Sequence, residues 1–457
     1  MTISNALASW ALEFKWSSVP SNVKTIIKEH CADGIGNAIG GSKSTVAQAA
    51  LATIIQSGHS DKATLWNSSL RSSVPGAAFY NAILIHALDF DDTHAGGLVH
   101  ATAPTLPVAW ALGESLNASG DEVIAAYTVG LEVISRLGAA SPHGFHARGL
   151  HATQVCGSIA SALVSAKLMK LSLEQSVHAM GIAGSFAGGL LEFLNTGSST
   201  KQIHPGIAAQ AGINAATLAA HGATGPESVL EGEYGIYRTL SNRSVDLDSI
   251  TSDLGRVWQS GLITIKPYPA CQLSHVTLDA TRAAWMQART DGYSSSDISS
   301  ISAKVHRDSL SIVCEPFTSK ISPKTAYDAK FSLPWSVSVL LIDGEIGISS
   351  FSEESILRSE VTALASKFSY TPSEDHGAAA AASGEVVIST YDGHEYMGVV
   401  ASSTGGPGNR LSLADLSAKF LGQGTDLDLA AEVFDDLLHI DESSTIQEIS
   451  AKIARLR

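Results

Sequence analysis

The chain has 457 residues, a length that accommodates two or three domains. Hydrophobic residues make up 44% of it and charged residues 16%, so most of the chain can be buried in a core. The formal net charge of −15 argues against sequence-independent binding of nucleic acid and against attachment to an anionic membrane surface, because both need a basic face. No apolar run approaches the roughly 20 residues of a membrane span, and Met1–Lys15 lacks the basic start and apolar block of a signal peptide.

The four cysteines lie far apart, and no two of them form a CxxC pair. This spacing fits a reducing compartment and supplies neither a zinc cluster nor an iron–sulfur cradle. We therefore expect a soluble, cytoplasmic, globular protein. The cysteines are Cys31, Cys156, Cys271 and Cys314.

Ala and Gly dominate the first 250 residues, where apolar positions recur with helical spacing. Helices this rich in small residues can approach one another closely, and Gly-containing turns separate them. The pattern predicts a helical bundle. Its clearest helices are expected over residues 77–88, 123–137, 158–168 and 207–220.

The pattern changes in the second half of the chain. From Ile298 onwards apolar and polar residues alternate, which is typical of a strand with one buried face. Two β-rich runs, 385–390 and 395–401, flank an Asp-Gly dipeptide at 392–393, a strong hairpin signal because Gly accepts the positive φ of a tight turn. A helix is expected over about 333–342, between these strand regions.

Helical spacing returns near the C-terminus, and its simplest placement is against the first helices. We therefore predict a mainly α protein with a large helical bundle domain and a smaller α+β domain, inserted before C-terminal helices that rejoin the bundle. The predicted boundaries are 1–262 for the helical domain, 263–401 for the α+β domain and 402–457 for the C-terminal helices.

The most informative stretch is His86–His94, HALDFDDTH, which is followed by His100. An apolar helix ends there in three carboxylates, although negative charge at a helix C-terminus opposes the helix dipole. A charged cluster at a position where it destabilises the helix is a candidate functional site. The alternatives are an acidic surface loop and an Mg²⁺ site built on Asp89, Asp91 and Asp92, for which no second acidic motif of comparable strength provides support.

Two further motifs place ionisable groups at helix starts. His143, His146 and His151 precede a helix, and His151 opens it, where the dipole disfavours a charged imidazole and so favours a proton acceptor. Ser198–Gly206, SSTKQIHPG, opens the next helix with Lys201, where unpaired N–H groups and the ammonium attract anions. Capping or packing histidines and an ordinary surface lysine are the alternatives.

A last motif, KPYPACQLSH at Lys266–His275, stands at the expected domain junction. Two prolines stiffen it, and domain junctions are common places for ligand pockets. A stiff linker with a solvated lysine is the alternative. Together, the carboxylates, histidines and lysines beside helix termini indicate a site for a di- or tricarboxylate and for proton transfer.

These motifs, with TGPESVLEGEYG at Thr224–Gly235 and AKFSLP at Ala329–Pro334, resemble the MmgE/PrpD family, that of 2-methylcitrate dehydratase, over essentially the whole chain. The family also contains cis-aconitate decarboxylase and iminodisuccinate epimerase. The resemblance implies a large helical domain, a smaller lid domain, a homodimer, and neither a metal nor an organic cofactor. The expected catalytic residues are Asp89, His100, His151, Lys201 and Lys266, and the expected substrate-binding residues are Thr93, His204 and His275.

The resemblance also implies roles for the catalytic residues, since the family's reactions move a proton at a carbon next to a carboxylate. Lys201 and Lys266 would stabilise negative charge on the substrate carboxylate, which is often the largest catalytic term. His151 or Asp89 would be the general base, and His100 the acid that protonates a leaving hydroxyl.

The chain departs from the family pattern at several positions. Many members read His-Pro-Ser where this chain has His100 followed by Ala and Thr, and Pro205 is displaced within the lysine motif. The decarboxylase has a histidine soon after the lid lysine, where this chain has Cys271, whereas His275 matches dehydratase-like bacterial members.

We therefore predict a hydro-lyase that dehydrates a hydroxylated di- or tricarboxylate of the citrate or 2-methylcitrate type. The latter substrate would connect it with propionate metabolism. The alternatives are a dicarboxylate isomerase or epimerase, a cis-aconitate-type decarboxylase, and a non-catalytic carboxylate-binding protein.

Overall fold

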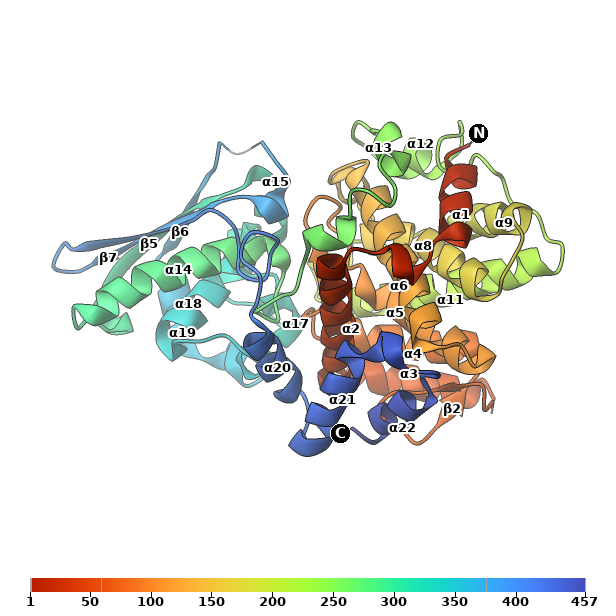
Figure 1. Cartoon of the computed structure of the whole chain (residues 1–457). Helices are drawn as coiled ribbons and strands as arrows, with labels where there is room; N and C mark the ends of the chain where they lie inside the picture. Colours follow the sequence, from red (N-terminus) through yellow and green to blue (C-terminus); the bar gives the residue numbers. More distant parts are fainter. Residues whose placement is uncertain (1, 59, 375, 457) are drawn as a thin grey trace. The chain divides into compact units, whose positions relative to one another are not determined.

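The computed structural model describes residues 2–58, 60–374 and 376–456 (Figure 1). Helices account for 59% of the chain and strands for 8%, so the predicted mainly α fold is confirmed. The chain forms two compact units: unit 1 comprises Met1–Leu191, Thr200–Ile265 and Ser412–Arg457, and unit 2 comprises Glu192–Ser199 and Lys266–Leu411. The units thus divide after Ile265 and Leu411, where the sequence analysis placed boundaries after 262 and 401, and unit 2 includes a short additional segment.

Unit 1 is helical, with two antiparallel pairs of two-residue strands. The pairs are β1 (Ala63–Thr64) with β2 (Arg71–Ser72), and β3 (Thr93–His94) with β4 (Ile263–Thr264). Its helices are α1 (Ile3–Glu13), α2 (Ser21–Gly41), α3 (Thr45–Gln56), α4 (Val74–His86), α5 (Thr102–Leu116), α6 (Gly120–Ala139), α7 (Gly144–Ala147), α8 (Ala152–Leu168), α9 (Leu173–Gly184), α11 (Thr200–Ala220), α12 (Ile236–Leu240), α13 (Asp248–Thr251), α20 (Leu413–Leu421), α21 (Leu427–Leu438) and α22 (Gln447–Arg455).

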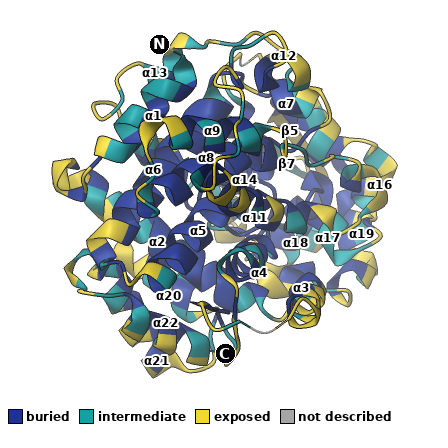
Figure 2. Cartoon of the chain, turned by 90° about the vertical axis from the view of Figure 1, so that its right-hand side faces the viewer, coloured by how far each residue is buried: buried dark blue, intermediate teal, exposed yellow. Residues whose placement is uncertain are grey.

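Small residues let the central helices of unit 1 pack closely. Helix α11 contacts α8 and α4, and a Cβ added to Gly212 of α11 would lie 2.3 Å from the Cβ of Ser161 in α8. Similarly, a Cβ added to Gly130 of α6 would lie 2.7 Å from the Cβ of Thr105 in α5. Figure 2 shows α5 and α8 coloured almost entirely as buried, so these helices form the core on which the site is built.

Unit 2 combines helices with a four-stranded mixed sheet in the order β6-β5-β7-β8. Helix α14 packs against strands β7 and β8 (Figure 1). The strands are β5 (Ile298–Val305), β6 (Phe368–Pro372), β7 (Gly384–Thr390) and β8 (Glu395–Val400). The helices are α10 (Phe193–Thr196), α14 (Gln272–Thr290), α15 (Arg307–Ser309), α16 (Phe317–Ile321), α17 (Ala326–Ala329), α18 (Leu333–Asp343) and α19 (Ser359–Ala365).

The local signals for strands in unit 2 are confirmed. Strands β7 and β8 pair antiparallel, Ser389 opposite Glu395, and Gly393 in the turn has a φ of +90°. Ile301, Ala303 and Val305 of β5 are buried, as the alternation predicted. Among the described residues, no helix has both the length and the apolar character that crossing a membrane requires.

Candidate active site

The three carboxylates after α4 are buried, so the alternative of an acidic surface loop is wrong. Helix α4 starts with Ser73 as its N-cap and ends at His86; the chain then turns through Asp89, whose φ of +53° lies in the left-handed region that Asp tolerates better than most residues. Asp89, Asp91 and Asp92 are each at most 1% exposed. Charges buried to this extent need specific partners.

Each of these carboxylates has a different partner. The Lys201 ammonium donates to Asp89 over 2.7 Å. Asp91 lies 2.9 Å from Nδ1 of His86, the last residue of α4. Asp92 accepts from the backbone N–H and the hydroxyl of Thr102 at the start of α5. The acidic run therefore supplies three separate interactions.

A divalent cation would have to compete with these partners. One ligand atom from each of His86, Asp89, Asp91 and His100 lies within 4.8 Å of the others, so the donor set could hold an ion. The Lys201 ammonium, however, already neutralises Asp89. The Mg²⁺ hypothesis also required Asp92, whose carboxylate is turned towards Thr102 and, at 2.9 Å, His30. The three carboxylates thus do not form one oxygen-rich site.

His100 connects the carboxylate loop with α11. Its Nδ1 lies 3.0 Å from the backbone carbonyl of Asp92, and its Nε2 lies 3.3 Å from Nζ of Lys201. Nδ1 is also 3.4 Å from the hydroxyl of Thr93 on β3. The backbone N–H of His100 donates to the hydroxyl of Thr153 in α8, which fixes the residue between two helices.

His151 and His204 form a second group beside His100. His151 is the N-cap residue of α8, as expected, and its Nδ1 lies 3.1 Å from Nδ1 of His204 in α11. One of these nitrogens must donate and the other accept. The rings of His151 and His100 are 5.7 Å apart.

Burial and charge set the protonation states of these groups. Burial, with a further contribution from the nearby Lys201 charge, holds the pKa of His151 well below its usual value, and the pKa of His204 is lowered to about 3, mainly by burial. Burial also lowers the pKa of His86. Burial opposes the ionisation of Asp91, but His86 and His100 outweigh it and hold its pKa well below the usual range. The site therefore combines neutral imidazoles with an ionised carboxylate.

Six of the eight predicted residues come together in unit 1, and two belong to unit 2. The six are Asp89, Thr93, His100, His151, Lys201 and His204. Lys266, whose side chain is buried, begins the main segment of unit 2. His275, in the first turn of α14, donates from Nε2 to the carbonyl of Ala270 over 3.1 Å and packs edge-on against Tyr268. His275 thereby braces the segment that carries Lys266.

The sequence analysis did not select His86 as a site residue, although it begins the HALDFDDTH motif. The sequence signal that could have identified His86 is its position five residues before Asp91, which is the hydrogen-bond partner of His86 in the structure. The sequence analysis also expected Lys201 to contribute positive charge to the pocket. That expectation is incomplete, because the ammonium of Lys201 is paired with Asp89.

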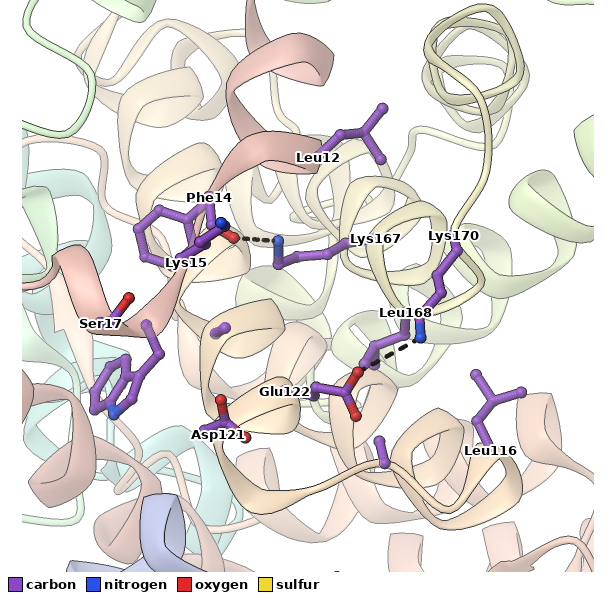
Figure 3. Close-up of a pocket in the computed structure, with 13 residues that line it drawn as sticks. Leu12, Phe14, Lys15, Ser17, Leu116, Asp121, Glu122, Lys167, Leu168 and Lys170 are labelled. Atoms are coloured by element: carbon purple, nitrogen blue, oxygen red, sulfur yellow. Dashed lines mark hydrogen bonds and ion pairs between the residues drawn. The ribbon is translucent and has the colours of Figure 1, made fainter. Parts of the chain in front are cut away.

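A separate pocket of about 370 Å³ lies between α1, α6 and α8 (Figure 3). None of the predicted site residues lines it. The Lys167 ammonium donates to the carbonyls of Ala11 and Phe14, and Lys170 pairs with Glu122 over 3.6 Å. The principal charged groups of this pocket therefore hold the end of α1 and the start of α6 in place.

Comparison with known sequences identifies the family. Models of the MmgE/PrpD N-terminal domain and of the MmgE/PrpD C-terminal domain match residues 5–247 and 268–435. The chain belongs to the MmgE/PrpD family. The expectation from the sequence motifs is thereby confirmed.

Several curated relatives of this MmgE/PrpD protein are named cis-aconitate decarboxylase. The human protein is 32% identical over 313 residues, which are 66% of this chain and 63% of the human one. The mouse protein is 31% identical over 298 residues, 64% of this chain and 59% of its own. An Aspergillus terreus protein is 27% identical over 392 residues, 82% of this chain and 79% of its own. The chain thus matches less than two thirds of the length of the mouse and human relatives.

Proposed function

We propose that this MmgE/PrpD protein is a lyase that acts on a di- or tricarboxylate by moving a proton at a carbon next to a carboxylate. The observation that carries the proposal is the buried hydrogen-bonded series of Asp89, Lys201 and His100, with neutral His151 beside it. A buried ammonium and a neutral imidazole in one site can donate and accept a proton. The names of the relatives support a lyase.

The environments of the groups favour particular roles. His151 is the better general base, because it is neutral, whereas Asp89 is already bound to an ammonium. The positive charge of Lys201 stabilises the negative charge that builds up on the substrate when the carbon loses its proton. Thr93 has a hydroxyl beside His100 that can donate to a substrate carboxylate. Lys266 remains a predicted catalytic residue.

We propose dehydration of a hydroxylated tricarboxylate of the citrate or 2-methylcitrate type as the reaction. In this dehydration, the base takes a proton from the carbon next to a carboxylate. The C–O bond to the hydroxyl breaks, and the hydroxyl leaves as water after it takes a proton from the site. The position of Cys271, where the decarboxylase pattern has a histidine, favours this reaction over decarboxylation. The second candidate is decarboxylation of an unsaturated tricarboxylate such as cis-aconitate, which the names of the relatives favour.

A proton NMR assay in deuterated buffer distinguishes these reactions, with citrate, 2-methylcitrate, cis-aconitate and iminodisuccinate as substrates. We expect a new vinylic signal from one of the hydroxy acids. Loss of a carboxylate from cis-aconitate would establish the second candidate instead. Deuterium at the α-carbon without an alkene would show an isomerase. Citrate binding without any turnover, in protein that is folded, would overturn the lyase proposal.

We further propose that the protein is a cytoplasmic homodimer that uses neither a metal nor an organic cofactor. The four cysteines are buried and far apart in the sequence, as a reducing compartment permits. Light scattering should give twice the chain mass of 47.5 kDa. Activity should be unchanged after treatment with a chelator, and activity that returns only with added Mg²⁺ would refute the metal-free mechanism.

A further inference from the structure

His86 is fully buried, and its partners give it a defined protonation. Its Nδ1 lies 2.9 and 3.0 Å from the two oxygens of Asp91. Since Asp91 is ionised and can only accept, Nδ1 of His86 carries the proton and donates it. The same carboxylate also lies 3.4 Å from Nδ1 of His100. Asp91 therefore stands between two imidazoles.

The hydrogen bonds of His100 define its tautomer. The carbonyl of Asp92, 3.0 Å from Nδ1, has no proton to give, so Nδ1 of His100 must be the donor. A neutral His100 then has a lone pair on Nε2, which accepts from the Lys201 ammonium at 3.3 Å. In this state His100 cannot donate a proton from Nε2. In this tautomer, the acid role that the sequence analysis gave to His100 requires another proton donor.

We propose that Lys201 protonates the leaving group, that His100 relays a proton back to Lys201, and that His86 is a positioning residue which holds Asp91 ionised behind His100. This inference deepens the proposed lyase function and rests on it. The protons balance: His151 takes one from the substrate carbon as the C–H bond breaks, and Lys201 gives one to the hydroxyl as the C–O bond breaks. His151 is then an imidazolium and Lys201 a neutral amine, and one proton transfer through His100 restores both.

The three rings of the proposed site are near neighbours. One ring nitrogen from each of His86, His100 and His151 lies within 4.8 Å of the others. An imidazolium formed at His100 would face the carboxylate of Asp91, which stabilises it, and Asp89 at 3.8 Å. Among the titratable groups around His100 are His86 of α4, Asp89 and Asp91 of the following loop, His146 of α7, His151 of α8 and Lys201 of α11.

Histidine ¹⁵N NMR of the full-length labelled protein tests the tautomer and the relay without any substrate. The signals of His100 are assigned by their loss in His100→Gln. We expect neutral His100 to be protonated at Nδ1. In His86→Leu we expect Asp91, which has lost its donor, to bind a proton more readily. A neutral Asp91 no longer stabilises an imidazolium at His100, so His100 should become protonated only at a pH lower by one unit or more. A proton on Nε2 in the wild type, or an unchanged titration in His86→Leu, would overturn the proposal.

Two conservative variants separate positioning from packing. The amide of Asn places an N–H near Nδ1 of the histidine it replaces, whereas that of Gln places it near Nε2. His86→Asn should therefore retain the titration of His100, and His86→Gln should lose it. This comparison decides the question even if His86→Leu does not fold. His30, equally buried and with its Nδ1 2.9 Å from Asp92, provides the matched control. A shift of the His100 titration in His30→Gln equal to that in His86→Gln would overturn the specific role of His86.

Kinetics with the substrate found by the NMR assay complete the test. His86→Gln should lower kcat about 100-fold and leave KM unchanged, and the acid limb of its pH profile should move in the same direction as the His100 titration. His86→Asn should restore most of kcat. Equal kinetics in the two variants would refute the positioning role but leave the lyase function intact. Absence of lyase activity in the wild type would refute the proposed function, while the tautomer of His100 could still be measured.

Discussion

Lys201 of unit 1 and Lys320 of unit 2 are both buried, but their ammonium groups have different partners. In unit 1 the ammonium of Lys201 lies 2.7 Å from the carboxylate of Asp89, and the pair is neutral overall. In unit 2 the ammonium of Lys320 donates to the carbonyls of Ile312 and Phe331, over 2.6 and 2.8 Å. Carbonyl oxygens satisfy the N–H groups but leave the positive charge in place.

Lys330 of unit 2 also donates to a backbone carbonyl. Its ammonium donates to the carbonyl of Pro269 over 2.7 Å and lies 4.5 Å from the centre of the Phe351 ring, where the π electrons favour a cation. Burial lowers the pKa of Lys320, as expected for an ammonium removed from water. From this difference we expect Lys201 to exchange protons within a compensated group, and Lys320 to retain a positive charge suited to an anion.

The largest effect should follow from breaking the compensated pair of unit 1. Lys201→Met removes the proposed proton donor, so turnover should fall by about 10³–10⁴-fold. It also leaves the buried charge of Asp89 without its ammonium, which should cost roughly 3–5 kcal/mol of unfolding free energy. Urea unfolding and the NMR assay measure the two effects. Asp89→Asn combined with Lys201→Met should recover stability but not activity; recovery of both would exclude Lys201 from the reaction.

Lys266 tests whether unit 2 contributes to catalysis. Lys266→Ala should lower turnover about 10²–10³-fold, the usual effect of removing one group that stabilises developing charge. The loss of stability should be smaller than in Lys201→Met. Full activity in the variant would remove Lys266 from the mechanism, and an equal loss of stability would indicate a structural lysine.

Local signals predicted much of this architecture. The Asp-Gly turn predicted the β7–β8 hairpin, and the polar residues before Ala-rich stretches predicted that His151 and Lys201 stand at the starts of α8 and α11. The partners of buried charges could not be predicted in this way. Asp89 and Lys201 are 112 residues apart in the sequence, and nothing in their local spacing shows that packing of α11 against α4 brings them together.

The neutral imidazoles of unit 1 should make stability depend on pH, and His94 of β3 allows this to be measured. The backbone N–H of Gly97 donates to its Nδ1 over 3.0 Å, and its Nε2 lies 3.1 Å from the side-chain oxygen of Gln259. Burial lowers its pKa to about 4. Because an unfolded histidine has a pKa of about 6.5, the unfolded state binds more protons between these values. The stabilisation by neutral His94 is therefore complete above pH 6.5 and is lost as the pH falls towards 4.

Urea unfolding from pH 7 to pH 4 should show this loss. His94→Gln removes one such titration, so the slope of unfolding free energy against pH should decrease by about 1.4 kcal/mol per pH unit. Replacement of the exposed His221 by Gln is the control and should leave the slope unchanged. The same slope in His94→Gln as in the wild type would show that His94 is not held neutral by the fold.

The smallest expected effect gives the sharpest test of the difference between the units. Lys320→Met is the same substitution as Lys201→Met, at a side chain of similar burial, with 8% of the residue exposed at Lys320 and 5% at Lys201. It leaves two carbonyl groups without their donor but no unpaired charge, so the unfolding free energy should fall by only about 1–3 kcal/mol. If both variants lose the same stability, the carboxylate of Asp89 and the carbonyls of Ile312 and Phe331 stabilise their lysines equally, and the expected difference in charge compensation between Lys201 and Lys320 is wrong.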